Sequence, residues 1–87
     1  MDLRFIGIDP NTGDDECPTV WVDNDAQEIV IQGWKAGPEM VDKISDTQWV
    51  AGHKTGIPDT EGVFRLPARM VPALREACDA VERAQLR

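Results

Sequence analysis

The residue types that most often carry chemistry in proteins are sparse in this chain. His53 is the only histidine, and Cys17 and Cys78 are the only cysteines. A transition-metal site needs several nitrogen or sulfur ligands, and these three residues do not supply a plausible set. His53 lies in the polar segment Gly52–Gly56, which indicates a solvent-exposed loop histidine. We therefore expect no metal ligand and no cofactor.

The two cysteines are poor candidates for nucleophiles. Cys78 has helical spacing on an apolar stripe, which predicts an inert, buried thiol. Cys17 is expected to be more exposed, but it directly follows the negative charges of Asp14, Asp15 and Glu16, which disfavour a thiolate. Two cysteines so placed do not make a disulfide framework, and we expect both thiols to be reduced.

Acidic and polar residues recur at every second position near the N-terminus, at Asp9, Asn11, Gly13 and Asp15. Calcium loops show this spacing, but they need an oxygen ligand at the fifth position and a glutamate at the twelfth. Those positions hold Gly13 and Val20. The interpretation we favour is a turn in a solvated acidic loop, and weak fortuitous cation binding is the alternative. The other carboxylates are numerous, and nothing singles out a catalytic pair. We expect no catalytic residue and no enzyme activity.

The balance of charge favours a protein partner over a nucleic acid. Asp and Glu outnumber Lys and Arg by 16 to 9, which gives a formal net charge of -7. Such an excess opposes direct binding to nucleic acid or to an anionic membrane surface, because both require a basic patch. An acidic surface can instead meet a basic face of another protein, including one that binds DNA. The alternative is that the charge only keeps the surface solvated.

Alternation and turn residues predict antiparallel strands in the first half of the chain. Leu3–Ile8 is a short apolar run that indicates a first strand or an extended arm. Thr19–Val22 and Glu28–Trp34 are rich in β-branched and aromatic residues, and the polar segment 23–27 between them predicts a hairpin. Gly62–Leu66 is expected to be a final strand.

Helical patterns occupy two later segments. Pro38 and Glu39 suit a helix N-terminus, and the apolar residues after them predict one or two turns. Segment 45–61 is mostly loop, with a short strand at Trp49 and Val50 as an option. The C-terminal segment is the clearest helix, beginning near Met70 or Val71. One stripe of this helix is apolar and is expected to dock on a sheet: Met70, Val71, Leu74, Ala77, Cys78 and Val81.

These elements predict an α+β fold, a small antiparallel sheet of three to five strands with the C-terminal amphipathic helix packed on one face. A length of 87 residues leaves room for a single domain spanning 1–87. No segment approaches the ~20 apolar residues of a membrane span, and the N-terminus lacks the pattern of a secretion signal. We expect a cytoplasmic protein that does not associate with membranes.

The three tryptophans are the second feature that indicates binding. Each tryptophan can bury roughly 150 to 250 Å², and so small a core cannot easily hide all of them. By alternation, Val20 and Val22 share one face of the hairpin, and Trp21 takes the other. If the helix covers the valine face, Trp21 lies on the reverse face, where an aromatic side chain often marks a binding surface. The alternative is that Trp21 packs under segment 45–61.

Four blocks of the chain carry a resemblance to a known group: Phe5–Pro10, Cys17–Asp23, Ile31–Lys35 and Arg65–Pro72. Together they resemble small acidic actinobacterial proteins that are encoded beside helix-turn-helix (Xre-type) transcriptional regulators. The resemblance spans most of the chain and assigns a role to no individual residue. It implies an accessory role in transcription regulation, as a partner or antagonist of such a regulator.

The leading hypothesis is a non-catalytic, antitoxin-like regulatory module whose acidic surface binds a basic helix-turn-helix protein. The predicted partner-binding residues are Trp21, Trp34, Asp14, Asp15 and Glu16. A second hypothesis is a structural homodimer joined through a strand edge or the Trp21 face. The third is a small-molecule binder or enzyme, which predicts a concave pocket near Trp49 and His53.

Overall fold

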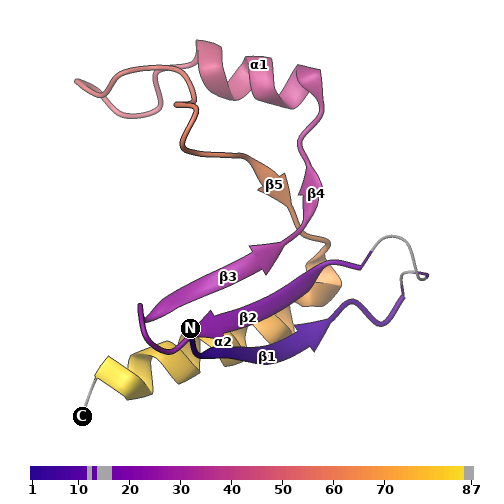
Figure 1. Ribbon diagram of the computed structural model, residues 1–87. Helices are drawn as coiled ribbons and strands as arrows, with labels where there is room; N and C mark the ends of the chain where they lie inside the picture. Colours follow the sequence, from indigo (N-terminus) through magenta and orange to yellow (C-terminus); the bar gives the residue numbers. More distant parts are fainter. Residues whose placement is uncertain (12, 14–16, 86–87) are drawn as a thin grey trace. The chain divides into compact units, whose positions relative to one another are not determined.

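The computed structural model describes residues 1–11, 13 and 17–85 (Figure 1). The chain divides into two compact units. Unit 1 combines Met1–Trp34 with Leu66–Arg87, and unit 2 is the segment Lys35–Arg65 between them. The fold is mixed α+β, as predicted, with a three-stranded sheet, a two-stranded sheet and a C-terminal helix.

Unit 1 is built on the antiparallel sheet β1–β2–β3, with β1 at Leu3–Ile8, β2 at Thr19–Asp23 and β3 at Glu28–Gln32. The predicted hairpin is confirmed in β2 and β3. Its turn is held by Asp23, whose Oδ1 accepts hydrogen bonds from the backbone N–H groups two and three residues later, at 3.0 and 3.1 Å. An aspartate in this position mimics a backbone turn, which explains why a polar segment of this kind reverses the chain.

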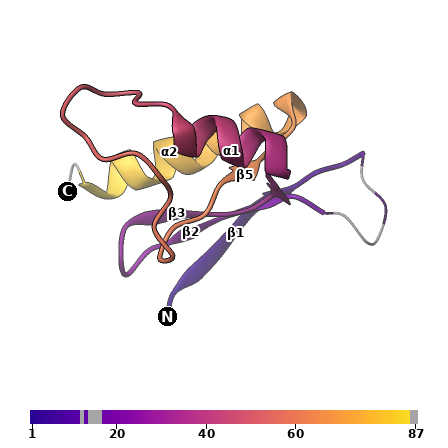
Figure 2. The same cartoon turned by 90° about the horizontal axis from the view of Figure 1, so that it is seen from above.

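Helix α2, at Val71–Gln85, runs across one face of this sheet (Figures 1 and 2). A single turn of 3₁₀ helix, η1 at Ala68–Met70, precedes it, so the predicted start near Met70 or Val71 is confirmed. Pro72 is the second residue of α2, where a backbone N–H would have no intrahelical acceptor, so the proline is tolerated.

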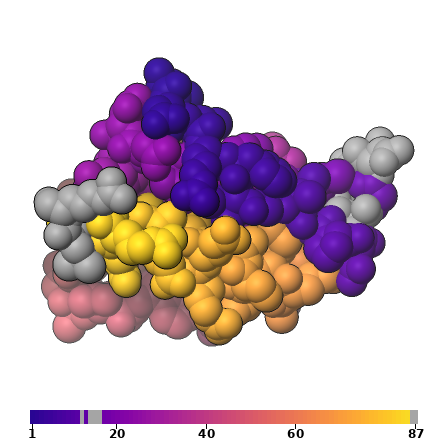
Figure 3. Space-filling model, turned by 90° about the horizontal axis from the view of Figure 1, so that it is seen from below, coloured from indigo at the N-terminus to yellow at the C-terminus, as the bar shows by residue number. Residues whose placement is uncertain are grey.

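The core of unit 1 lies between α2 and the sheet. Val20 and Val22 of β2 meet Met70 and Ala77 there, and all four are buried. Figure 3 views the molecule from the side on which β1 and α2 lie against each other. Val20 and Val22 therefore face the helix, as the alternation predicted.

The predicted stripe of α2 is wrong at two positions. Cys78 and Val71 are exposed, whereas Ala73 and Ala80 pack against the core. Gly7 explains the difference, because a Cβ placed on Gly7 would lie only 3.1 Å from the Cβ of Ala73. The missing side chain lets β1 and α2 approach closely at the two small residues, and this contact turns the small alanines of the helix toward the sheet.

Unit 2 begins and ends in a short antiparallel pair. β4 (Trp34–Lys35) pairs with β5 (Phe64–Arg65), and the N–H of Ala36 donates to the carbonyl oxygen of Val63 at 3.2 Å. The predicted strand Glu28–Trp34 is too long, because the chain leaves the first sheet at Gly33. The predicted final strand likewise reduces to the two residues of β5.

Between these strands unit 2 contains one helix and a long loop. Helix α1 covers Pro38–Asp46, with Pro38 and Glu39 in its first turn as predicted. The option of a short strand at Trp49 and Val50 is wrong, since Trp49 has no regular structure and Val50 lies in a bend. The structure describes every residue of Lys35–Arg65, and none of them is buried. Among the described residues of the whole chain, no helix combines the length and apolar character that a membrane crossing requires.

Candidate interaction surface

The face of the first sheet that points away from α2 is organised in three rows. Residues that pair across antiparallel strands project to the same face, so the register defines each row. The central row is Phe5, Trp21 and Val30; the row on one side is Leu3, Asp23 and Glu28; the row on the other is Ile8, Thr19 and Gln32. An apolar and aromatic centre therefore lies directly beside an acidic row.

The outer face is open to solvent mainly along β1. Phe5 is 57% exposed, and Leu3 and Ile8 are also exposed, whereas Trp21 and Val30 are half-buried. A β-bulge between Phe5 and Gly7 lets Ile6 pack against the core while Phe5 and Ile8 both project to the outer face. The bulge thus gives β1 three apolar side chains on this face, whereas strict alternation from Phe5 would place Gly7 there in place of Ile8.

Acidic groups gather at the end of the sheet beside Leu3. Asp23 and Glu28 are directly opposite each other in the hairpin. Asp2 donates its backbone N–H to Oδ2 of Asp25 at 3.0 Å, and the N-terminal ammonium lies 3.8 Å from the same oxygen. This end of the surface therefore carries several carboxylates, and among the described residues the N-terminal ammonium lies next to that of Asp25.

A separate polar cluster ties three distant segments of unit 1 together. The Asp9 side chain is buried, and its two oxygens accept hydrogen bonds from Arg69 Nε at 2.6 Å and Nη2 at 2.7 Å. The Arg69 guanidinium carbon lies 5.9 Å from the ring centroid of Trp34, within the range of a cation–π contact. Two parallel hydrogen bonds fix the arginine geometrically, so the cluster joins the end of β1, the start of η1 and the start of β4.

The electrostatics of this pair are consistent with its geometry. The hydrogen bonds from Arg69 hold the pKa of the Asp9 carboxyl below its ordinary value, against the opposing effect of desolvation. The same bonds raise the pKa of Arg69. Asp9 is therefore not part of a solvated loop, and that prediction is wrong. The residues are 60 positions apart, and no local pattern signals the pairing.

The predicted partner-binding residues are placed differently from one another. Trp21 lies in the central row of the outer face, opposite the helix. Trp34 is half-buried, and part of its ring is engaged by Arg69. Asp14, Asp15 and Glu16 lie outside the described residues. The prediction from sequence missed Phe5 and Val30, which alternation along β1 and β3 could have placed beside Trp21.

The two cysteines exchange their predicted exposures. Cys78 is exposed, because the stripe of α2 that faces the sheet passes through Ala77 and not Cys78. Cys17 is half-buried, and its S–H donates to the carbonyl oxygen of Gly13 at 2.9 Å. Both thiols are free. His53 is exposed in a loop, as predicted. Within the described residues no group of three or more His, Cys, Asp or Glu side chains is placed to hold a metal ion.

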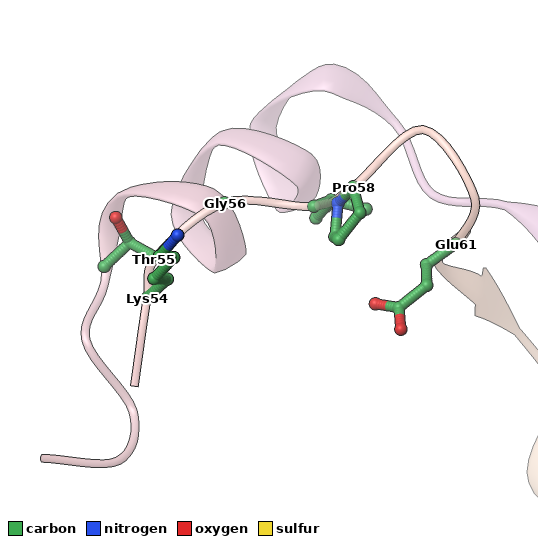
Figure 4. Close-up of a pocket in the computed structure, with 6 residues that line it drawn as sticks. Lys54, Thr55, Gly56, Pro58 and Glu61 are labelled. Carbon is green, nitrogen blue, oxygen red and sulfur yellow. The ribbon is translucent and has the colours of Figure 1, made fainter. Parts of the chain in front are cut away.

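Unit 2 carries surface hollows near Trp49 and His53, where the small-molecule hypothesis requires a concavity. A small hollow of about 120 Å³ touches both residues. A hollow of about 410 Å³ is lined by the loop Lys54–Pro58 and by Glu61 (Figure 4). A third, of about 540 Å³, lies between α1 and Trp49. In the second hollow Lys54 and Glu61 lie at opposite ends of the lining, as Figure 4 shows.

Comparisons of the chain with protein-family models, with curated proteins and with solved structures found no match.

Proposed function

We propose that this protein is a non-catalytic binding module that recognises a basic protein through the outer face of its first sheet. The observation that carries the proposal is the apolar row Phe5, Trp21 and Val30 beside an acidic row. Phe5 is exposed in this row, and Trp21 and Val30 are half-buried. Protein interfaces are typically built from an apolar, aromatic centre with a polar rim, and aromatic side chains contribute most of the binding energy.

The acidic row supports the choice of a basic partner. Like charges directly opposite each other in a hairpin destabilise it, and Asp23 and Glu28 are so placed. Asp23 has a structural reason to be there, since it accepts the N–H groups of the turn. Glu28 has no such reason among the described contacts. A cationic side chain supplied by a partner would relieve the repulsion between the two carboxylates.

The partner we propose is a helix-turn-helix transcriptional regulator, bound in an accessory or antagonistic, antitoxin-like role. The recognition surface of such a regulator must be basic to bind DNA, so an acidic protein of net charge -7 complements it and competes with the nucleic acid. Asp14, Asp15 and Glu16 extend the proposed contact beyond the described residues. The proposed setting is the cytoplasm of an actinobacterium.

The test is affinity capture from the organism that encodes the chain, followed by binding measurements with the purified partner. Recovery of a basic DNA-binding protein whose affinity falls as salt rises supports the proposal. Replacing Trp21 by threonine keeps a good strand former but removes the aromatic anchor. An anchor at the centre of an interface is worth about 2 kcal/mol or more, so Trp21→Thr should weaken binding by about 30-fold or more.

A matched pair of charge variants tests the rim. Glu28→Gln removes one carboxylate from the proposed surface, and Glu82→Gln removes one from an exposed position on α2. Glu28→Gln should weaken partner binding by about 2- to 5-fold and reduce its salt dependence. Glu82→Gln should leave both unchanged. Equal effects of the two variants would mean that only net charge matters, and the assignment of this face would be wrong.

A homodimer through the same face or through a strand edge is the competing outcome. The bulge in β1 makes that edge irregular, whereas β3 is an outer strand without one. Sedimentation velocity over a wide range of protein concentrations separates the two cases. A mass that stays monomeric at every concentration excludes the homodimer. A dimer that Trp21→Thr dissociates would mean that this face binds a second copy of the chain and not a different protein.

A further inference from the structure

The hollow between α1 and Trp49 has a mixed apolar and cationic lining. It lies between α1 and the loop that follows, with a volume of about 540 Å³, within the range of small-molecule sites. Met40 and Ile44 of α1 and the indole of Trp49 line it, together with Lys43 and Arg65. Gly37 and Glu39 complete the lining at the start of the helix.

The wall formed by Trp49 is fixed by hydrogen bonds at the end of α1. The last carbonyl groups of a helix have no intrahelical donor and need other partners. Here Trp49 Nε1–H donates to the carbonyl oxygen of Ile44 at 3.1 Å, and Thr47 Oγ1–H donates to that of Lys43 at 2.7 Å. The indole ring is therefore anchored at its edge, yet the residue remains 64% exposed. An anchored and exposed aromatic ring is a preorganised contact surface.

The apolar side chains around the hollow are not covered within unit 2. Met40 is exposed and Ile44 is half-buried, although α1 is amphipathic. Segments shorter than roughly 40 residues seldom bury enough surface to be stable without additional support. A ligand that covers Met40, Ile44 and Trp49 would bind only the ordered form of unit 2 and would stabilise it by mass action.

The charges of the lining select the ligand class. Lys43 and Arg65 contribute two positive charges, and Glu39 contributes one negative charge, so the hollow is net cationic in a protein of net charge -7. Glu39 and Lys43 are four residues apart on α1, a spacing that often gives an ion pair. Among the described residues, however, no carboxylate lies within 4.0 Å of Lys43 Nζ. Lys43 also complements the dipole at the C-terminal end of α1, which alone would account for a lysine there.

We propose that this hollow binds an amphiphilic carboxylate. The apolar body of the ligand lies against Met40, Ile44 and Trp49, and its carboxylate is directed to Lys43. The site belongs entirely to unit 2, and it stands independently of the interaction surface on unit 1.

The probe for the experiment is octanoate, titrated into the full chain and followed by ¹H–¹⁵N and methyl NMR spectra. The expected result is a saturable shift of the Trp49 indole N–H and the Met40 methyl signals, with the Trp21 indole N–H unmoved. Octan-1-ol has the same apolar body without the charge and should bind more weakly. Equal binding of the alcohol, or shifts centred on Trp21, would overturn the proposal.

Exposed lysines of unit 2 provide a matched control for the charge. Lys43→Gln removes the cation from the hollow, whereas Lys35→Gln makes the same change in β4, outside the lining. Lys43→Gln should raise the dissociation constant of octanoate by about 2- to 5-fold, the usual worth of an exposed charge pair. Lys35→Gln should leave it unchanged. If both variants weaken binding alike, the attraction comes from net charge and the site assignment fails.

Discussion

Adding one methyl group at Gly7 tests the contact that orients α2 on the sheet. In Gly7→Ala the new Cβ lies 3.1 Å from the Cβ of Ala73, which is closer than ordinary van der Waals contact, so the helix must move by a few tenths of an ångström. Overpacking of this kind costs about 1 to 3 kcal/mol. The loss of glycine's freedom in the unfolded chain offsets about 0.4 to 1 kcal/mol. The expected net destabilisation is about 0.5 to 2 kcal/mol.

The partner substitution makes the prediction specific to this contact. Ala73→Gly alone should cost about 1 to 2 kcal/mol, because one apolar methyl is lost at about 0.8 kcal/mol and glycine in place of alanine costs up to about 1 kcal/mol in a helix. In the double variant the methyl group has moved from the helix to the strand, and the clash is absent. The double variant should therefore be more stable than the sum of the single effects by about 1 kcal/mol or more.

Urea denaturation of the four proteins, followed by far-ultraviolet circular dichroism, measures the cycle. Gly13→Ala is the matched control, since a Cβ there meets no atom within 4 Å, and it should be neutral or slightly stabilising. Additivity of the two single variants within about 0.5 kcal/mol would refute the view that Gly7 and Ala73 set the approach of helix to sheet.

Three further outcomes follow from the packing and the hydrogen bonds. The hydrogen bonds from Arg69 lower the pKa of Asp9 in the folded protein. The stability advantage of the wild type over Asp9→Asn should therefore be complete above about pH 4 and shrink as the pH falls through the lowered pKa. An equal difference in unfolding free energy at pH 6 and pH 2, measured by urea titration, would contradict this. Val20→Ala removes fully buried methyl groups and should cost about 2 to 3 kcal/mol in the same assay, whereas Val50→Ala, at an exposed position, should change stability by less than about 0.5 kcal/mol. Thr47→Val removes the donor to the end of α1 and should speed hydrogen exchange of the α1 amides by about 2- to 10-fold, and unchanged exchange would show that this cap does not stabilise the helix.

The candidate interaction surface could be anticipated only in part. Trp21 was placed opposite the helix by the alternation of β2, and the register confirms it. Alternation along β1 is compatible with Phe5 beside Trp21, but it does not place Ile8 on the same face. The bulge between Phe5 and Gly7 shifts the side chains that follow it and brings Ile8 there. Such a bulge arises from pairing with β2 and from packing against the core, so the sequence of β1 alone does not predict it.

The sequence by itself determined the features that depend on near neighbours. The β-branched run of β2 specifies a strand with its valines on one face, Asp23 specifies the turn, and Pro72 limits where α2 can begin. Each of these follows from steric preferences and hydrogen bonds within a few residues, which is why period and propensity predict them.

The tertiary structure alone decided how these elements meet. It brought the carboxylate of Asp9 to the guanidinium of Arg69 across 60 residues, and it turned α2 so that Ala73 faces Gly7 and Cys78 faces solvent. These outcomes depend on the shapes and charges of segments that are remote in the chain. Their stabilising contacts exist only after the chain has folded, and no periodicity within either segment encodes them.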